Sequence, residues 1–182
     1  MKIRDEADRL LYGTELLRIL EHYGKTHLVG SYRMDMMSWN DLDVNIERDD
    51  DPPREVLFAL STEVSGALKP YRFEGRRFPE SGDLFFGCET DVTGSCWNVD
   101  VWFRKKADIA ETEKYCDAVR RRVSGDPALG RAILRIKREL IRRKLYGPDK
   151  MPGRHYHSVE IYNAVFGEGI LTCPEFLEKH PR

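Results

Sequence analysis

Two short segments of the chain carry acidic side chains in a pattern that suits metal-assisted phosphate chemistry. Residues 41–47 alternate acidic or amide side chains with apolar ones, and residues 96–103 carry Asp100 between two valines. Successive side chains of a strand point to opposite faces, so Asp41 and Asp43 share one face and leave the apolar face for the core. If the two strands are neighbours, three carboxylates converge. Because like charges repel, such a cluster favours a hard divalent cation, above all Mg²⁺.

A Gly-Ser pair precedes the first acidic segment and suits a bound phosphate. Residues 25–29 are expected to form a short strand that ends at Gly30 and Ser31. Glycine lets the backbone approach a phosphate closely. A helix that begins over residues 32–37 would also direct free N–H groups at an anion. We expect Gly30 and Ser31 to bind phosphate, with Arg33 in the same turn as a further nucleotide-binding residue.

These motifs resemble those of the DNA polymerase β-like nucleotidyltransferase superfamily, with small bacterial and antibiotic nucleotidyltransferases among its members. The resemblance rests on Val-Gly-Ser at 29–31, Asp-Leu-Asp-Val at 41–44 and Val-Asp-Val at 99–101, within residues 25–104. Tyr-Arg-Met-Asp follows the Gly-Ser pair where small members often have Ala-Arg-Gly. Trp-Asn precedes the aspartates where they often have Ser. The subfamily is therefore left open.

The resemblance implies an α+β fold, with a mixed β-sheet core and flanking helices. It implies transfer of a nucleoside monophosphate from an NTP, expected to be ATP, to an acceptor hydroxyl with release of pyrophosphate. Asp41, Asp43 and Asp100 would be the catalytic residues and the ligands of two Mg²⁺ ions. Gly30 and Ser31 would hold the β- and γ-phosphates.

The acceptor we expect is a small hydroxylated molecule, for example an aminoglycoside-like or lincosamide-like antibiotic. One alternative is an enzyme of a toxin–antitoxin or signalling pair that nucleotidylates a protein. An alternative of another class is a non-catalytic nucleotide-binding or interaction module. With 182 residues and a net charge of −1, the chain lacks the basic character typical of proteins that bind long nucleic acids.

Composition also indicates where the protein works. The N-terminus has no apolar signal core, no apolar run approaches membrane-spanning length, and the four cysteines show no paired spacing. We therefore expect a cytoplasmic protein without a membrane partner. The sequence does not indicate an oligomeric state.

Composition shifts near residue 106, which predicts a nucleotidyltransferase catalytic core over 1–106 and a helical C-terminal region over 107–182. Hydrophobic periodicity and turn residues predict the individual elements. Strands are expected over 25–29, 41–47, 71–74, 84–90 and 95–104, with a loop over 75–82. Helices are expected over 4–23, 54–68, 109–123, from 127 to a Gly-Pro stop at 147–148, 158–166 and 174–179.

Some charged clusters allow two interpretations. Four arginines at helical spacing form either a basic wall for phosphate or a solvated face. The aspartates at 49–51 suit a solvated turn and helix start better than a metal site. His155 and His157 lack further metal ligands nearby. Trp102 is expected on the Asp100 face, where it could stack on a base or sugar. The four arginines are Arg131, Arg135, Arg138 and Arg142.

Overall fold

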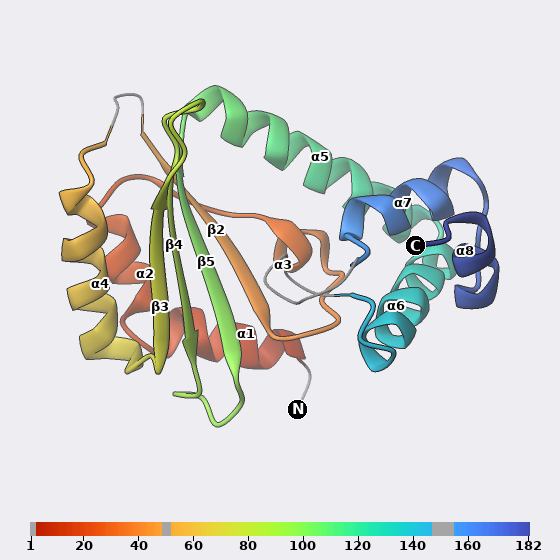
Figure 1. Cartoon of the computed structure of the whole chain (residues 1–182), viewed down its shortest axis with the longest axis horizontal. Helices are drawn as coiled ribbons and strands as arrows, with labels where there is room; N and C mark the ends of the chain where they lie inside the picture. The colour runs from red at the N-terminus through yellow and green to blue at the C-terminus, as the bar shows by residue number, and fades with distance from the viewer. Residues whose placement is uncertain (1–2, 49–51, 147–154) are drawn as a thin grey trace. The chain divides into compact units, whose positions relative to one another are not determined.

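The computed structural model describes residues 3–48, 52–146 and 155–182, and it shows an α+β fold (Figure 1). A mixed five-stranded sheet with flanking helices lies in the first of two compact units, Met1–Asp117 and Ala118–Arg182. The predicted fold class is therefore confirmed. The domain boundary that we placed at residue 106 stays a prediction.

The elements are bounded as follows. The strands are β1 (Thr26–Leu28), β2 (Asp41–Glu47), β3 (Arg72–Arg77), β4 (Leu84–Thr90) and β5 (Trp97–Arg104). The helices of the first unit are α1 (Ile3–Tyr12), α2 (Leu16–Glu21), α3 (Gly30–Met34) and α4 (Glu55–Leu68). Helix α5 (Lys106–Gly125) begins in the first unit and ends in the second, which holds α6 (Pro127–Arg142), α7 (Ser158–Gly167) and α8 (Cys173–Lys179).

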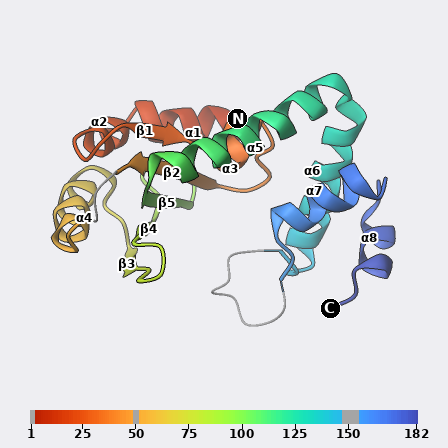
Figure 2. The same cartoon turned by 90° about the horizontal axis from the view of Figure 1, so that it is seen from above.

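The strand order is β1-β2-β5-β4-β3, and only the central pair β2–β5 is parallel. Alternation gives this sheet one apolar face, where residues such as Leu42, Val44, Val99 and Val101 are fully buried. Helices α1, α2 and α4 pack against that face and close the hydrophobic core (Figures 1 and 2). The opposite face of β2 and β5 carries the acidic side chains.

The helix that we predicted over residues 4–23 is wrong as a single element, because the chain breaks between α1 and α2. Thr14 explains the break. Its hydroxyl donates to the Leu10 carbonyl at 2.6 Å and accepts from the Leu16 N–H at 3.1 Å. Such local side-chain bonds compete with the helical ladder.

Strand β3 runs to Arg77, beyond the predicted end at residue 74. Its ladder with β4 pairs every residue from Arg72↔Glu89 to Arg77↔Leu84. Pairing therefore overrides the weak strand preference of a segment that contains Gly75 and two arginines.

The second unit is helical, as the sequence predicts. Asp126 accepts the Ala128 N–H at 2.9 Å and Pro127 occupies the first turn, so α6 starts where it was expected to start. One face of α6 is buried, and α7 and α8 pack against this helix. The Gly-Pro stop expected at 147–148 lies outside the described residues.

None of the helices within the described ranges has the length and apolar composition needed to cross a membrane. The four cysteines are free, and only Cys96 is exposed. Burial, together with the nearby Asp100 carboxylate, raises the pKa of the Cys88 thiol to about 12. Cys88 therefore stays protonated and serves as a small apolar core residue.

Gly66 offers a test of the fold that leaves the acidic face alone. It lies inside α4, where no heavy atom lies within 4 Å of an added Cβ. We expect Gly66→Ala to raise the free energy of unfolding by about 0.5–1 kcal/mol, because glycine loses more conformational freedom than alanine in a helix. Urea denaturation would measure the change. A loss of stability would contradict the assignment of this segment to a helix with open space at Gly66.

Candidate active site

The register of β2 and β5 brings the acidic residues together on one face of the sheet. Asp43 is the direct partner of Asp100, and Asp41 is the partner of Asn98. Neighbouring strands lie about 4.8 Å apart, so the Asp43 and Asp100 side chains start from adjacent positions. Asn98 Nδ2 donates to Asp41 Oδ1 at 2.7 Å, which fixes that carboxylate. The three aspartates are half-buried.

Gly30 and Asp43 fit together so closely that residue 30 has no room for a side chain. Gly30 has a φ of +59°, a conformation that side chains disfavour. An added Cβ would lie 2.0 Å from Asp43 Oδ2, so the carboxylate occupies the space that any other residue would fill. The Val29 N–H donates to the Asp43 carbonyl at 3.2 Å and extends the β1–β2 pairing to this point. The Gly-Ser turn therefore lies directly against the acidic strand.

Ser31 lies in the same turn with its hydroxyl buried. The residue is 9% exposed, and Oγ makes no hydrogen bond to any residue in the described ranges. Buried hydroxyls are normally satisfied by a protein group, a water or a ligand. Helix α3 begins at Gly30 itself and lasts five residues. It therefore starts earlier than expected and offers one turn of backbone N–H groups.

Helix α1 holds α3 in place through one arginine and one tyrosine. The Arg4 guanidinium lies 3.6 Å over the Tyr32 ring and donates to the Tyr32 carbonyl at 2.7 Å. The Tyr32 hydroxyl donates to Asp8 at 2.6 Å. Burial and this hydrogen bond raise the pKa of Tyr32, so the hydroxyl remains a donor.

Arg33 ties the other side of the turn to α5. Its guanidinium donates to both oxygens of Asp117, at 2.8 and 3.0 Å, and to Glu113 at 2.7 Å. The hydrogen bond to Asp117 raises the pKa of Arg33. Cys116 is buried between these acids, and its thiol interacts with the Gly30 backbone. We expected Arg33 to bind nucleotide; the structure adds the two acidic partners, which sequence reasoning missed.

His27 of β1 extends this network. Its two ring nitrogens lie 3.2 Å from Glu47 and 3.2 Å from Glu113, and its side chain is 10% exposed. Lys106 Nζ lies 3.6 Å from the other oxygen of Glu47. Charged contacts therefore link β1, β2 and α5. The only sequence signal for the α5 acids was their spacing of four, which places Glu113 and Asp117 on one helix face.

The other side of Asp100 is lined by β4. Gly87 is its ladder partner there, and a Cβ at this position would lie 2.8 Å from the Phe85 ring and 3.3 Å from Asp100 Oδ1. The rings of Phe85 and Trp102 have centroids 4.7 Å apart, and Phe78 lies 5.2 Å from Trp102. Trp102 is half-buried on the Asp100 face, where alternation predicted it. An aromatic surface therefore borders the acidic cluster.

The acidic cluster fits Mg²⁺ in combination with a substrate. Within the described ranges, no group of three or more His, Cys, Asp or Glu side chains is arranged to hold a metal ion. Mg²⁺ is commonly bound by one or two carboxylates together with substrate phosphates. Asp43 and Asp100 provide such a pair, and Asp41 lies two residues away on the same face. The donor set therefore fits a metal that arrives with a triphosphate.

The arginine and histidine clusters singled out in the sequence lie in the second unit. The arginines of α6 are exposed, and Arg142 pairs with Glu139 at 2.7 Å. His155 is buried, whereas the His157 backbone N–H donates to Glu160 at 2.7 Å at the start of α7. Both interpretations of the arginine face stay predictions. The aspartates at 49–51 lie outside the described residues.

Comparisons with known proteins identify structures of similar fold at low sequence identity. No protein-family model matches the sequence, and no curated protein matches it. Among solved structures, the non-canonical poly(A) polymerase complex GLD-2–GLD-3 aligns with a TM-score of 0.64 and 14% identity, over 97% of this chain and 58% of that one. A cytoplasmic RNA terminal U-transferase aligns with a TM-score of 0.60 and 15% identity, over 90% and 46%. The Cid1 poly(U) polymerase aligns with a TM-score of 0.58 and 17% identity, over 80% and 43%.

The chain thus spans about half the length of the structures that it resembles. At this level of identity the likeness concerns the fold, which is that of the polymerase β-like nucleotidyltransferases. The resemblance inferred from the Gly-Ser and aspartate motifs is confirmed to that extent. The roles assigned to Asp41, Asp43, Asp100, Gly30 and Ser31 remain predictions that the geometry makes specific.

Gly30→Ala tests the fit between the turn and the acidic strand. The new methyl group would displace the Asp43 carboxylate and would also strain a backbone at positive φ, so we expect a loss of about 1–3 kcal/mol of stability. We also expect Mg²⁺-dependent NTP binding, measured by calorimetry, to fall below detection. Gly66→Ala is the matched control, since it makes the same change in open space. Unchanged NTP binding by a folded Gly30→Ala protein would contradict the role of this contact.

Arg33→Gln and Asp117→Asn together separate two roles for Arg33. If the guanidinium only fixes the turn against α5, both changes should cost about 1–3 kcal/mol of stability, as hydrogen bonds between charged groups do. They should then weaken NTP binding equally. If Arg33 also binds phosphate, as predicted, Arg33→Gln should weaken NTP binding about tenfold more than Asp117→Asn. Thermal denaturation and NTP titration of both variants provide the comparison.

Proposed function

We propose that the protein is a Mg²⁺-dependent nucleotidyltransferase that moves a nucleoside monophosphate from an NTP to an acceptor hydroxyl and releases pyrophosphate. One observation carries the proposal: Asp43 lies beside Asp100 across two parallel strands, and its carboxylate lies against Gly30. This arrangement places carboxylates next to a turn with backbone N–H groups and a buried hydroxyl. Carboxylates for a metal and donors for a phosphate are what the reaction needs.

Each residue has a role in this proposal. Asp41, Asp43 and Asp100 would hold the metal, with Asp41 oriented by Asn98. When bound, Mg²⁺ supplies positive charge that stabilises the attacking and leaving oxygens of an in-line displacement. Ser31 would donate to the triphosphate. Asp100, on the strand nearer the aromatic surface, would accept a hydrogen bond from the attacking hydroxyl.

Two details of the donor side are also proposed. Two metal ions would suit a site with three carboxylates and a triphosphate. ATP is the donor that we expect, although one similar structure is described as Mg- and 3'-dATP-bound in a study of UTP selectivity. Base selectivity depends on a few edge contacts and a stacking surface. Competition among the four NTPs for binding would identify the preferred donor.

A small hydroxyl-bearing molecule is our first candidate for the acceptor. The sheet face next to Asp100 is charge-balanced, because three arginines there pair with carboxylates. A balanced face suits a compact polar acceptor better than a polyanion, which basic surfaces attract. The pairs are Arg72–Glu89 at 3.0 Å, Arg76–Glu74 at 3.2 Å and Arg104–Asp83 at 3.3 Å.

The 3′ hydroxyl of an RNA is the second candidate, and the comparisons favour it. The similar structures are described as poly(U) and non-canonical poly(A) polymerases and an RNA terminal U-transferase. They share the fold over most of this chain. Transfer to a protein and nucleotide binding without catalysis are the remaining alternatives.

A radiolabelled-NTP assay with Mg²⁺ separates these candidates. Acceptors would be hydroxylated antibiotics, a short single-stranded RNA with a free 3′ hydroxyl, and the protein itself. We expect label on a small molecule and a loss of about 100-fold or more in Asp43→Asn, since even residues that only support metal ligands cost 10–100-fold.

Asp91→Asn in the β4–β5 turn is the matched control, because it makes the same change at an exposed site. Label on RNA alone would select the second candidate. Equal activity of Asp43→Asn and the unmodified protein would refute the metal assignment. Mg²⁺-independent NTP binding without pyrophosphate release for any acceptor would favour a non-catalytic module.

A further inference from the structure

Strand β3 forms one edge of the sheet and has β4 as its neighbour on one side (Figure 1). It reads Arg-Phe-Glu-Gly-Arg-Arg over residues 72–77. An edge strand presents unpaired backbone groups and is a template for another strand. Its three arginines would repel a strand that carries positive charges at the facing positions. Glu74, its one acidic residue, favours a strand with a positive charge opposite it.

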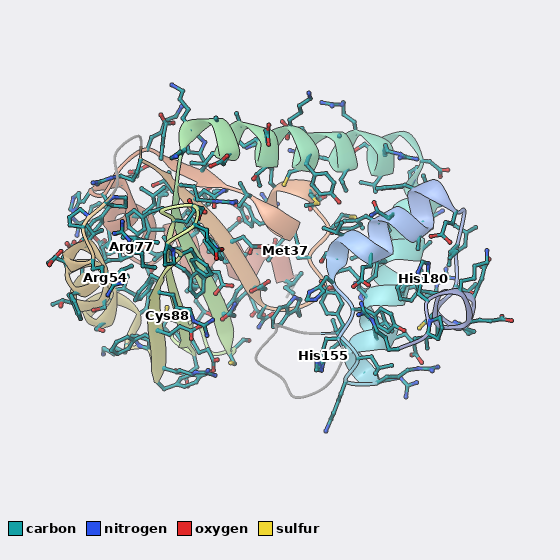
Figure 3. The ribbon with its side chains drawn as sticks, turned by 45° about the horizontal axis from the view of Figure 1, so that its top comes forward. Met37, Arg54, Arg77, Cys88, His155 and His180 are labelled. Atoms are coloured by element: carbon teal, nitrogen blue, oxygen red, sulfur yellow. The ribbon has the colours of Figure 1, made fainter. Side chains whose placement is uncertain are left out.

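Aromatic side chains gather at this edge. Phe73 and Tyr71 are each 58% exposed, and Phe58 of α4 is 72% exposed. Between α4 and β3 lies a cavity of about 350 Å³, lined among others by Leu57, Phe58, Phe73 and Phe86. Figure 3 shows two further lining residues, Arg54 and Arg77, side by side at this edge. Clustered exposed aromatic residues mark interaction surfaces. Arg54 and Arg77 add positive charge to the rim of this cavity, which we call the aromatic groove.

Backbone geometry determines which residues of β3 direct their N–H and C=O groups toward the free edge of the sheet. The Phe78 N–H donates to the Asp83 carbonyl at 2.9 Å, in register with the β3–β4 ladder. Hydrogen-bonded positions alternate along an antiparallel pair, so Arg72, Glu74 and Arg76 bond to β4. Residues 73, 75 and 77 therefore turn their backbone N–H and C=O groups toward the free edge.

We infer that a second copy of this chain pairs with β3, antiparallel and about a two-fold axis at Gly75, and joins two sheets into one. In this register Glu74 lies opposite Arg76 of the partner subunit, twice by symmetry. These are non-hydrogen-bonded positions, where opposing side chains approach most closely. On the other face Phe73 lies opposite Arg77 of the partner subunit, which suits a cation–π contact. The aromatic groove then lies beside the partner subunit's strand.

The charges select this register over its neighbour. Shifting the two-fold axis to Glu74 would place the two Glu74 carboxylates opposite each other, and Arg72 opposite Arg76 of the partner subunit. Like charges directly opposite are destabilising. Glu74 and Arg76 already share one face within a copy, with Nη2 and Oε2 3.2 Å apart. Both side chains thus lie where they can form this ion pair between two copies instead of within one.

Charge reversal in the 182-residue chain tests the inference, and it does not depend on the proposed function. Sedimentation equilibrium should show a concentration-dependent dimer. Glu74→Arg and Arg76→Glu should each weaken it about tenfold or more, since each creates two like-charge pairs. The double variant Glu74→Arg/Arg76→Glu restores the opposite charges and should restore the dimer. Glu111→Arg, an exposed site on α5, is the matched control.

Cross-linking supplies a second measurement. In a Cys96→Ser background, Gly75→Cys should form a disulfide between copies, because hydrogen-bonded partners have Cα atoms about 5.5 Å apart, within disulfide range. Phe73→Cys should not, since its partner is residue 77. A monomer at all concentrations would overturn the inference. So would a dimer that neither single reversal weakens, or a folded double variant, verified by circular dichroism, that stays monomeric.

Discussion

The site depends on one steric constraint: the Asp43 carboxylate occupies the space where Gly30 would carry a side chain. This contact couples a turn at the end of β1 to the middle of β2. The parallel pairing of β2 with β5 then places Asp100 at the level of Asp43. The Gly-Ser turn and the carboxylate pair are therefore positioned by the same residue, Asp43. The carboxylate fits here because residue 30 carries no side chain.

Electrostatics then fix the turn from both sides. Arg4 of α1 lies over Tyr32, and Arg33 donates to two acids of α5. These contacts are partly buried, so water screens them less than surface ion pairs. By contrast, Asp41 is oriented by the neutral amide of Asn98, which fixes a carboxylate without neutralising it.

Whether the sequence predicts a feature depends on how far apart in the chain the interacting residues lie. Alternation is a local signal, and it correctly placed β2 and the shared face of Asp41 and Asp43. The break after α1 was missed because it depends on where the Thr14 hydroxyl bonds, which periodicity does not show. The Arg33–Asp117 pair joins residues 84 positions apart, so no local pattern predicts it. The convergence of Asp43 and Asp100 required strand order and register, where a slip of one residue would reverse every side chain.

The two sides of the acidic cluster are stabilised differently, and this difference suits group transfer. On the β1 side, His27 and Arg33 join strands and helix through partly buried contacts with Glu113 of α5. On the β4–β3 side, arginines pair with glutamates at a more exposed surface, where such pairs contribute little to stability. A rigid turn suits a donor whose triphosphate is the same in every reaction. An adaptable neighbouring surface allows one fold to serve different acceptors, which is why the acceptor must be identified from the side chains around Asp100 and by experiment rather than from the fold.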